Sequence, residues 1–287
     1  MRAVLKHELS GYFHSMTAYI FAAFLLAFVG VGAMMYNIRS SVANFEYVLS
    51  FVCIGFVAFV PIITMRVISE ERKQRTDQLL YSLPLKTTQI VLGKYLAMLV
   101  VYLIPLAIIA VYPLVFAQYG EVYLPTSYGS LLAFFCMGAA LISIGMFISS
   151  LTDSQGMAAG ITVAVILINY FSVSLADYVS TKAIGSAISF LVIAVLLGAL
   201  IRSLTRNENL ALGFTVIMVV VVGIIYFIDS SRFEGLLPNI MEKLSLFERF
   251  YTFTSGVFDL TAIVYYLTVI VFFSFLTVQS LEKRRYN

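Results

Sequence analysis

Charged side chains are scarce in this sequence. Only 11% of its 287 residues are Asp, Glu, Lys or Arg, whereas 61% are hydrophobic and the mean hydropathy is +0.97. The surface of a soluble globular protein needs about a quarter of all residues to be charged, so this composition excludes that class. We therefore expect a protein that crosses a membrane several times.

Cysteine and histidine are nearly absent as well. Cys53 and Cys136 both lie inside apolar runs, which indicates small core residues and predicts neither a disulfide framework nor a metal site. The two histidines, His7 and His14, lie near the amino terminus, where polar side-chain tips reach the membrane surface. The basic residues form no patch interleaved with aromatic side chains, so we expect no nucleic-acid partner.

Ionisable residues are missing from the middle of the long apolar segments. A charge at the bilayer centre costs about 2.5–3.5 kcal/mol on insertion scales, and it persists mainly where it functions, as in proton- or sodium-coupled carriers. An intramembrane protease would need a Ser/His pair, two Asp or an HExxH helix. The sequence therefore argues against both classes.

What the sequence has in abundance is apolar runs of about 20 residues, the length of a membrane-spanning helix. We expect eight spans, the sixth being the shortest: Met16–Tyr36, Tyr47–Thr64, Ile90–Ala117, Tyr128–Ser150, Gly156–Ala176, Ile184–Ile201, Leu210–Ile228 and Leu260–Gln279. The predicted fold is an all-α, polytopic membrane helical bundle that forms a single transmembrane domain over residues 1–287. Pro105 and Pro113 are expected to kink the third span, with neighbouring helices bonding the freed backbone groups.

Lysine and arginine are distributed unevenly among the connecting segments. With the amino terminus inside the cell, five of the 18 basic residues lie outside: Arg39, Lys182, Arg232, Lys243 and Arg249. The others lie in cytoplasmic segments, as the positive-inside rule favours. We therefore predict a multi-pass protein of the cell membrane with both termini in the cytoplasm, an arrangement that requires an even number of spans.

Amphipathic stretches lie at both surfaces of the predicted bundle. Residues 1–15 carry their apolar side chains on one helical face, which predicts an elbow helix lying in the cytoplasmic membrane interface. Residues 229–259 are the longest segment outside, and their apolar side chains recur at helical spacing from Leu244 to Tyr251. We expect a helix on the outer leaflet there.

The fifth predicted span contains a ridge of small residues and one strongly polar side chain. Gly156, Gly160 and Ala164 lie along one helical face, where small side chains let another helix approach closely. The ridge packs within the chain or forms a dimer seam. Asn169 lines a translocation path or hydrogen-bonds to another helix.

The longest strongly charged run, residues 65–94, lies between the second and third spans. From Ile68 to Leu83 its apolar residues recur at spacings of three and four, which predicts a helix with a narrow apolar stripe that Pro84 ends. A helix of this kind suits binding by a soluble partner better than an ordinary polar loop does. We refer to residues 66–89 as the 66–89 segment.

Four parts of this region resemble the cytoplasmic segment of type-2 (ABC-2-type) ABC exporter permeases, of the branch that includes the gliding-motility permease. They are Ile68–Arg72, Thr76–Leu80, Leu83–Leu85 and Gly93–Tyr95. The amino-terminal LKHELSGYF, the turn Ile148–Gln155 and the stretch Phe247–Leu260 are also similar to that branch. The resemblance implies a core of six spans, so the predicted pair between residues 184 and 228 is additional.

The resemblance also implies that the 66–89 segment is a coupling helix that docks on a separate ABC ATPase subunit. Two copies of the permease, or this chain and a related one, would form the path between them. The positions that we assign to ATPase coupling are Glu70, Glu71, Arg72, Thr76, Leu79, Leu80, Leu83 and Pro84. Here the charges of Glu70 and Glu71 would fix the alignment of the segment on the ATPase, and the leucines would provide an apolar anchor for binding.

The sequence itself contains no site for ATP. The phosphate-binding motif GxxxxGK[ST] is not met at Gly93-Lys94, because Tyr95 follows and Thr88 stands where the first glycine belongs. We also expect no nucleotide-binding domain, since no cytoplasmic segment approaches the length of one. The prediction is a non-enzymatic permease subunit of an ATP-driven exporter, with ATP and Mg²⁺ held by the partner.

Two alternatives remain. A non-transporting membrane scaffold or sensor is compatible with the same topology, and the presence or absence of a bound ATPase would distinguish it. A lipid-modifying membrane enzyme is less favoured, because its only candidate acids, Glu70, Glu71 and Asp77, lack histidine partners.

Overall fold

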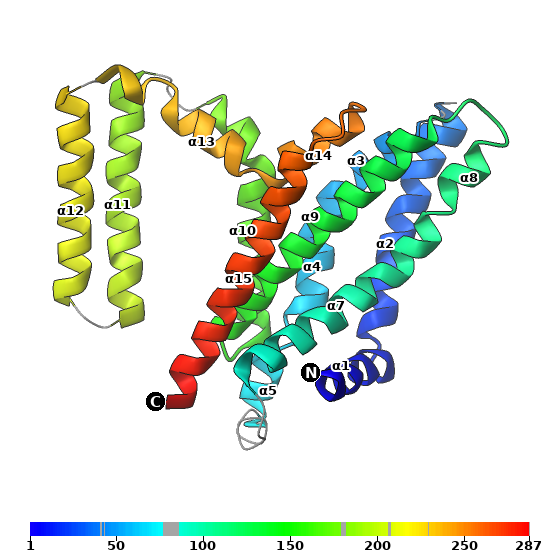
Figure 1. Cartoon of the computed structure of the whole chain (residues 1–287), viewed down its shortest axis with the longest axis horizontal. Helices are drawn as coiled ribbons and strands as arrows, with labels where there is room; N and C mark the ends of the chain where they lie inside the picture. Colours follow the sequence, from blue (N-terminus) through cyan, green and yellow to red (C-terminus); the bar gives the residue numbers. More distant parts are fainter. Residues whose placement is uncertain are drawn as a thin grey trace. The chain divides into compact units, whose positions relative to one another are not determined.

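The computed structural model describes residues 1–40, 42, 44–76, 86–178, 182–205, 208–228 and 230–286. The regular secondary structure in these ranges is helical (Figure 1). Packing contacts divide the chain into two compact units, with residues 1–168 and 249–287 in unit 1 and residues 169–248 in unit 2. The prediction of an all-helical, polytopic bundle is confirmed.

Six helical segments of the described chain are long and apolar enough to cross a membrane. They are α2 with the π-helix η1 (Thr17–Ala33, Met34–Arg39), the run from α3 to α5 (Glu46–Lys73), α7 with α8 (Thr87–Ile109, Tyr112–Phe116), α9 (Leu124–Leu151), α10 (Gln155–Ala176) and α15 (Leu260–Tyr286). They confirm six of the predicted spans. The predicted sixth and seventh spans correspond to α11 (Ala183–Thr205) and α12 (Glu208–Ile228), whose apolar parts are shorter. Eight crossings therefore stay a prediction.

Helix α9 lies at the centre of unit 1 and packs against α15, α7 and α4 (Phe56–Thr64). Its glycines let the neighbouring helices approach closely, since a Cβ atom at Gly138 would lie 2.5 Å from the hydroxyl oxygen of Tyr102. That hydroxyl donates to the Phe134 carbonyl at 2.9 Å, and the Phe134 ring lies 4.7 Å from the ring of Phe56. These buried contacts join α4, α7 and α9 into the body that carries the 66–89 segment.

The third predicted span is interrupted near its carboxyl-terminal end. Helix α7 ends at Ile109 and α8 begins at Tyr112, with Pro113 in its first turn. Proline has no N–H to donate to the carbonyl of Ile109, four residues earlier, and the neighbouring carbonyl of Ala110 accepts from the Tyr128 hydroxyl at 3.0 Å. Of the two prolines expected to kink the span, Pro113 follows a break in the helix, whereas α7 continues through Pro105.

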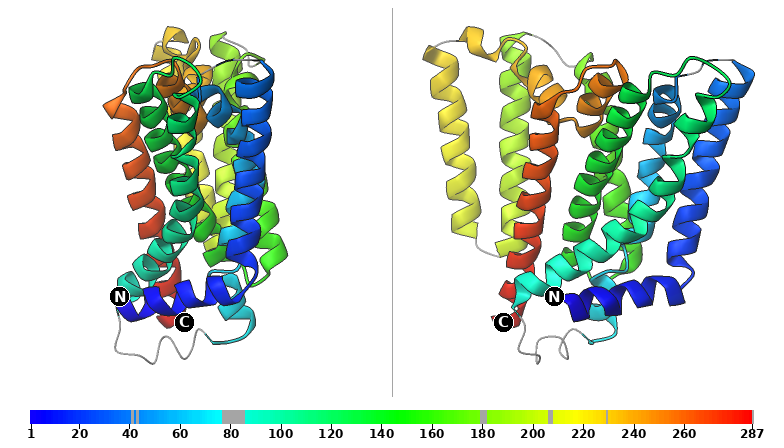
Figure 2. Two further views of the ribbon diagram at one scale, coloured as in Figure 1. Left: turned by 90° about the vertical axis from the view of Figure 1, so that its right-hand side faces the viewer. Right: turned by 45° about the vertical axis from the view of Figure 1, so that its right-hand side comes forward.

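Helix α1 (Arg2–His14) lies crosswise to the spans, at the end of unit 1 that also holds α5 (Ser69–Lys73) and the last turns of α15 (Figure 2). It packs on α7 at Gly93, where an added Cβ atom would lie 3.0 Å from Val4 Cγ1. The absence of a side chain at Gly93 therefore allows the two helices to touch. The location of α1 in the membrane interface stays a prediction.

Unit 2 contains a hairpin of α11 and α12. Ala187, Val222 and Phe233 form its small core, and the Phe190 ring packs against Phe233 with centroids 6.1 Å apart. The predicted helix through Leu244 to Tyr251 is instead divided between α13 (Leu236–Leu244) and α14 (Leu246–Thr254), because the backbone is extended at Ser245.

Candidate functional site

The 66–89 segment begins with a turn after α4 and the short helix α5. The helix ends at Lys73, and Arg75 adopts a φ of +57°, the left-handed conformation that residues with a side chain disfavour. The predicted continuous helix from Ile68 to Leu83 is therefore wrong at residues 74–76, since a right-handed helix does not pass through such a residue.

Half of the predicted coupling positions can be located. Residues 77–85 lie outside the described residues. The coupling positions within them are Leu79, Leu80, Leu83 and Pro84, and those located in the structure are Glu70, Glu71, Arg72 and Thr76.

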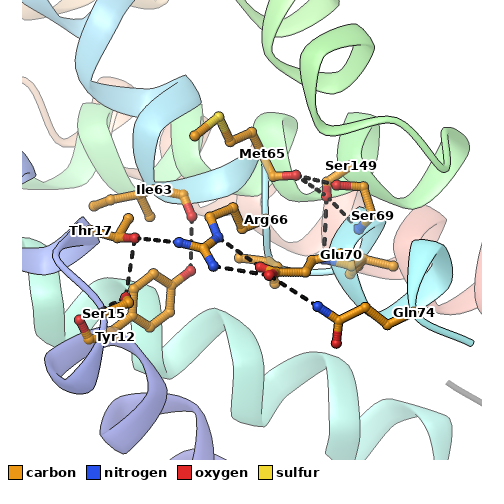
Figure 3. A network of polar contacts seen from close by, with 12 residues as sticks. Tyr12, Ser15, Thr17, Ile63, Met65, Arg66, Ser69, Glu70, Gln74 and Ser149 are labelled. Carbon is orange, nitrogen blue, oxygen red and sulfur yellow. Dashed lines mark hydrogen bonds and ion pairs between the residues drawn. The ribbon is translucent and has the colours of Figure 1, made fainter. Parts of the chain in front are cut away.

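Arg66 and Glu70 form a bidentate ion pair in the first turn of the 66–89 segment (Figure 3). Arg66 donates from Nε and Nη2 to the two carboxylate oxygens of Glu70, at 2.7 and 2.9 Å. Its remaining nitrogen donates to the Thr17 hydroxyl at the start of α2, at 3.1 Å. Paired hydrogen bonds between a guanidinium and a carboxylate fix direction as well as distance. The arrangement therefore ties α5 to the first span.

A side chain of α1 hydrogen-bonds to the backbone at the end of α4. The Tyr12 hydroxyl donates to the Ile63 carbonyl at 2.8 Å (Figure 3). Burial, and then the negative charge of Glu8, raises the pKa of the Tyr12 phenol well above its ordinary value. The phenol consequently keeps its proton and remains a donor at all physiological pH values.

Ser149, near the end of α9, binds the backbone where α5 begins. Its hydroxyl oxygen accepts from the N–H groups of Ile68 and Ser69, at 3.3 and 3.2 Å. These are among the first N–H groups of a helix, which have no partner within it. The Ser149 side chain therefore caps α5 from the central helix of the unit, and Figure 3 shows it facing Ser69 and Met65.

Lys94 of α7 contacts both α1 and the 66–89 segment. Its ammonium group donates to Glu8 of α1 and to Glu71 of α5, each at 2.6 Å, and to the Val67 carbonyl at 3.1 Å. The Lys94 side chain is 1% exposed, whereas those of Glu8 and Glu71 are 15% and 23% exposed. One buried cation thus links the amino-terminal helix, the 66–89 segment and the third span. We call Lys94, Glu8 and Glu71 the lysine clamp.

A second set of charges links α5 to the carboxyl-terminal helix. Asp153, in the turn between α9 and α10, lies 3.6 Å from the buried guanidinium of Arg72 and 3.0 Å from that of Arg284 in α15. Arg284 also donates to the Leu151 carbonyl at 3.3 Å. The described part of the 66–89 segment is thereby linked to α1, α2, α7, α9 and α15.

These contacts change the role expected for the two glutamates. We expected Glu70 and Glu71 to offer their charge to a partner, but Arg66 and Lys94 already engage them within the chain. The exposed side chains at the end of α5 and in the turn after it are Lys73, Gln74 and Arg75. The carboxylates anchor the segment, and the surface left for a partner in this part of it is basic.

The small-residue ridge of α10 has open space beside it. Within the described ranges, no atom outside its own helix lies within 4 Å of a Cβ atom placed on Gly160, and Gly156, Gly160 and Ala164 are all exposed. Ala158, Thr162 and Ile166, by contrast, form the buried face of α10. Of the two alternatives, packing of the ridge within unit 1 is not observed.

Asn169, in unit 2, hydrogen-bonds to the backbone between α13 and α14. Its oxygen accepts from the Leu246 N–H at 3.0 Å and its nitrogen donates to the Leu244 carbonyl at 3.3 Å. The second alternative for this residue, a hydrogen bond to another helix, is therefore the one observed. A role in a translocation path stays a prediction.

Sequence reasoning missed the partners of the anchoring residues. Lys94 lies near the start of an apolar span, and a lysine at that depth is a signal that a carboxylate is near. Its partners are 86 and 23 residues away, however, and no spacing rule connects them. Among the described residues, no three His, Cys, Asp or Glu side chains gather as a metal site requires.

Comparison with known families gives one finding. The family model described as ABC-2 family transporter protein matches residues 5–181, more than half of the chain. No curated protein matches the chain. The matched range begins within α1, includes the 66–89 segment and the lysine clamp, and ends before α11.

Proposed function

The chain belongs to the ABC-2 family of transporter proteins, and on that premise we propose that it is the permease subunit of an ATP-driven exporter. Members of this family are generally membrane components that are not catalytic themselves. The energy would come from a separate ATPase subunit, which holds ATP and Mg²⁺. Two permease copies, or this chain with a related one, would form the transport path between them.

The observation that supports this proposal is the set of contacts that attaches the first turns of the 66–89 segment to the membrane helices. Lys94 of α7 and Ser149 of α9 hold its first turns from two directions, and Arg66 within the segment bonds both Glu70 and Thr17 of α2. A segment attached in this way transmits a displacement to α2, α7 and α9 together, as rigid-body switching requires. This supports a coupling role for Glu70 and Glu71 as anchors, with Leu79 and Leu80 as the contact to the ATPase.

The arrangement of unit 1 also supports the predicted orientation. Helix α1, α5 and the end of α15 lie at the same end of the unit (Figure 2). The exposed basic side chains of Lys73, at the end of α5, and Arg75, in the turn after it, agree with a cytoplasmic location under the positive-inside rule. We propose that this end faces the cytoplasm, where an ATPase has access to it.

The open ridge of α10 supports a seam between two permeases. Gly156, Gly160 and Ala164 would let a helix of a second copy approach closely, and among the residues that the structure describes nothing lies within 4 Å of a Cβ atom placed on Gly160. The similarity of Ile68–Arg72 and Gly93–Tyr95 to the gliding-motility branch makes that branch our proposal for the subfamily.

The coupling proposal is tested by Leu79→Asp. A charge in place of an apolar anchor should weaken binding of the ATPase by about tenfold or more and reduce transport, while the chain still inserts. The measurement is recovery of the ATPase that co-purifies with the wild-type chain in mild detergent. Lys283→Ala on α15 is the matched control, because it removes one exposed charge outside the 66–89 segment, and such a charge contributes only about 0–1 kcal/mol. A Leu79→Asp chain that retains its ATPase and transports normally would remove the assignment.

The orientation is tested by labelling at position 73. In a chain with Lys73→Cys, Cys53→Ala and Cys136→Ala, a membrane-impermeant maleimide should label inverted membrane vesicles and leave intact cells unlabelled. Labelling of intact cells would put the 66–89 segment outside, beyond the reach of a cytoplasmic ATPase, and would refute the exporter proposal.

A further inference from the structure

An apolar groove lies on the surface of unit 1 between the far ends of α2 and α7. Its volume is about 700 Å³, within the range of about 300–1,000 Å³ usual for small-molecule sites. One wall includes Gly30, Met34 and Ile38, and the other includes Ile108, Val111 and Val115. No atom outside its own helix lies within 4 Å of a Cβ atom placed on Gly30, so this glycine faces open space.

Two backbone irregularities on facing helices coincide with the groove. On one side α2 continues into the π-helix Met34–Arg39, a rare wide turn that occurs frequently at functional sites. On the other side the helix is interrupted between Ile109 and Tyr112, ahead of Pro113. Both departures from α-helical geometry occur among the residues that line the groove, so the groove is a feature of the fold and does not depend on one side-chain rotamer.

The position of the groove in the fold indicates that it faces the lipid of the membrane. Its walls are the last residues of two segments that can span a membrane, 17–39 and 87–116. The groove therefore lies in the leaflet away from α1 and α5, next to the interface with water. Its lining is almost entirely apolar, and the surrounding hydrocarbon supplies acyl chains to fill it. The stretch from Gly30 to Ile38 rises about 12 Å, which accommodates a large part of one chain.

An arginine directly follows one wall of the groove in the sequence. Arg39 follows Ile38 directly, is exposed, and makes no ion pair with another described residue. Arginine recognises phosphate by paired, charge-assisted hydrogen bonds. An apolar slot followed by an arginine at the membrane surface matches the two parts of a phospholipid, the acyl chain and the phosphate.

We propose that this groove binds one phospholipid of the leaflet away from α1, with an acyl chain between α2 and α7–α8 and its phosphate at Arg39. An anionic lipid is favoured over a zwitterionic one, because no cationic head group then competes with the arginine. The lipid is a resident ligand and not the transported substrate. This site is independent of the proposed ATPase coupling, since it lies at the opposite end of the spans.

The proposal is tested by photo-labelling the full-length chain in vesicles of phosphatidylglycerol and phosphatidylcholine, with a diazirine on the acyl chain of a trace of either lipid. Labels should concentrate on residues 30–38 and 107–116. Gly30→Leu fills the slot and should lower this labelling by about threefold or more, because the new side chain takes the place of the acyl chain and its van der Waals contacts are lost. Ala107→Phe, from the opposite wall, should act in the same direction.

Two further variants separate the parts of the proposal. Gly223→Leu on α12 also enters open space and should leave the labelling of residues 30–38 unchanged. Arg39→Gln should reduce the preference for phosphatidylglycerol by about threefold, as expected for one surface charge contact, and keep the label in place.

Three outcomes would overturn the proposal. They are an even distribution of labels over the spans, indifference of the labelling to both wall variants, and an Ile38→Cys disulfide between two copies of the chain. The last result would make the groove a seam between proteins.

Discussion

Replacing Lys94 by methionine is expected to lower the free energy of unfolding by about 3–5 kcal/mol, the usual cost of removing one partner from a buried ion pair. Lys94 is 1% exposed and holds two carboxylates at 2.6 Å. Methionine keeps most of the side-chain volume but leaves Glu8 and Glu71 facing each other without a cation. Their repulsion and their incomplete hydration would separate α1 from α5. We expect the variant to lose transport together with stability.

The measurement can use the two cysteines of the chain. The sequence has no tryptophan, but Cys53 is buried and Cys136 is half-buried. A thiol-reactive dye therefore reports thermal unfolding in detergent, because the thiols become accessible as the helices separate. Lys94→Met should shift the unfolding midpoint downward by many degrees relative to the wild-type chain.

Two comparisons distinguish the lysine clamp from a general loss of packing. The triple variant Lys94→Met, Glu8→Gln, Glu71→Gln removes the uncompensated charges and should recover much of the lost stability, since neutral replacement of a buried ion pair is often tolerated. Lys73→Met changes the same residue type at an exposed position and should be nearly silent. Equal losses in the single and triple variants would show that the charges do not account for the effect.

The sequence predicted the spans because their signal is local. About 20 consecutive apolar residues can be recognised without knowing their neighbours, and six predicted spans appear in the structure, five of them within a few residues of their expected limits and the second extended to Lys73. The same holds for α1, whose apolar face repeats at helical spacing. A helix through residues 68–83 was predicted by the same rule, but Arg75 adopts a left-handed conformation that the periodicity does not reveal.

The anchoring of the 66–89 segment could not be predicted, because it depends on residues far apart in the chain. Ser149 caps backbone groups 80 and 81 residues earlier, and Glu8 reaches Lys94 over a separation of 86 residues. Each of these residues is unremarkable in its local context. The predicted ATPase-coupling role of Glu70 and Glu71 stays a prediction, but the structure changes its physical basis from exposed charge to internal anchoring.

A second large effect is expected from Gly145→Val in α9. A Cβ atom at this position would lie 2.5 Å from Thr64 Oγ1 and 2.9 Å from Thr64 Cβ. Thr64 is completely buried in α4 and its branched side chain has few alternative rotamers, so the two helices must separate. We expect a loss of at least about 3 kcal/mol in the free energy of unfolding, the upper end of the usual cost of overpacking.

The functional consequence follows from the position of Ser149, one turn beyond Gly145 on the same face of α9. When α4 moves away from α9, the N–H groups of Ile68 and Ser69 lose the Ser149 oxygen that caps them. Amide hydrogen exchange at residues 68 and 69 should therefore accelerate more than exchange in the middle of α9. Transport should fall even in detergent or lipid conditions that restore the unfolding midpoint, because the anchor of the 66–89 segment is lost.

The clash itself is tested by a double-mutant cycle with Thr64→Ala. That substitution removes Thr64 Oγ1 and Cγ2, two of the three atoms nearest to the new side chain, and gives up one hydrogen bond to Val60 within α4. It should recover about 1 kcal/mol or more of the stability lost in Gly145→Val, a coupling typical of residues in contact. Gly223→Val, which meets open space in unit 2, should change stability little. If the effects of Thr64→Ala and Gly145→Val on the free energy of unfolding simply added, the close approach of α4 and α9 at this point would not position the 66–89 segment. Ser149 alone would then have to account for the anchoring of the segment to α9.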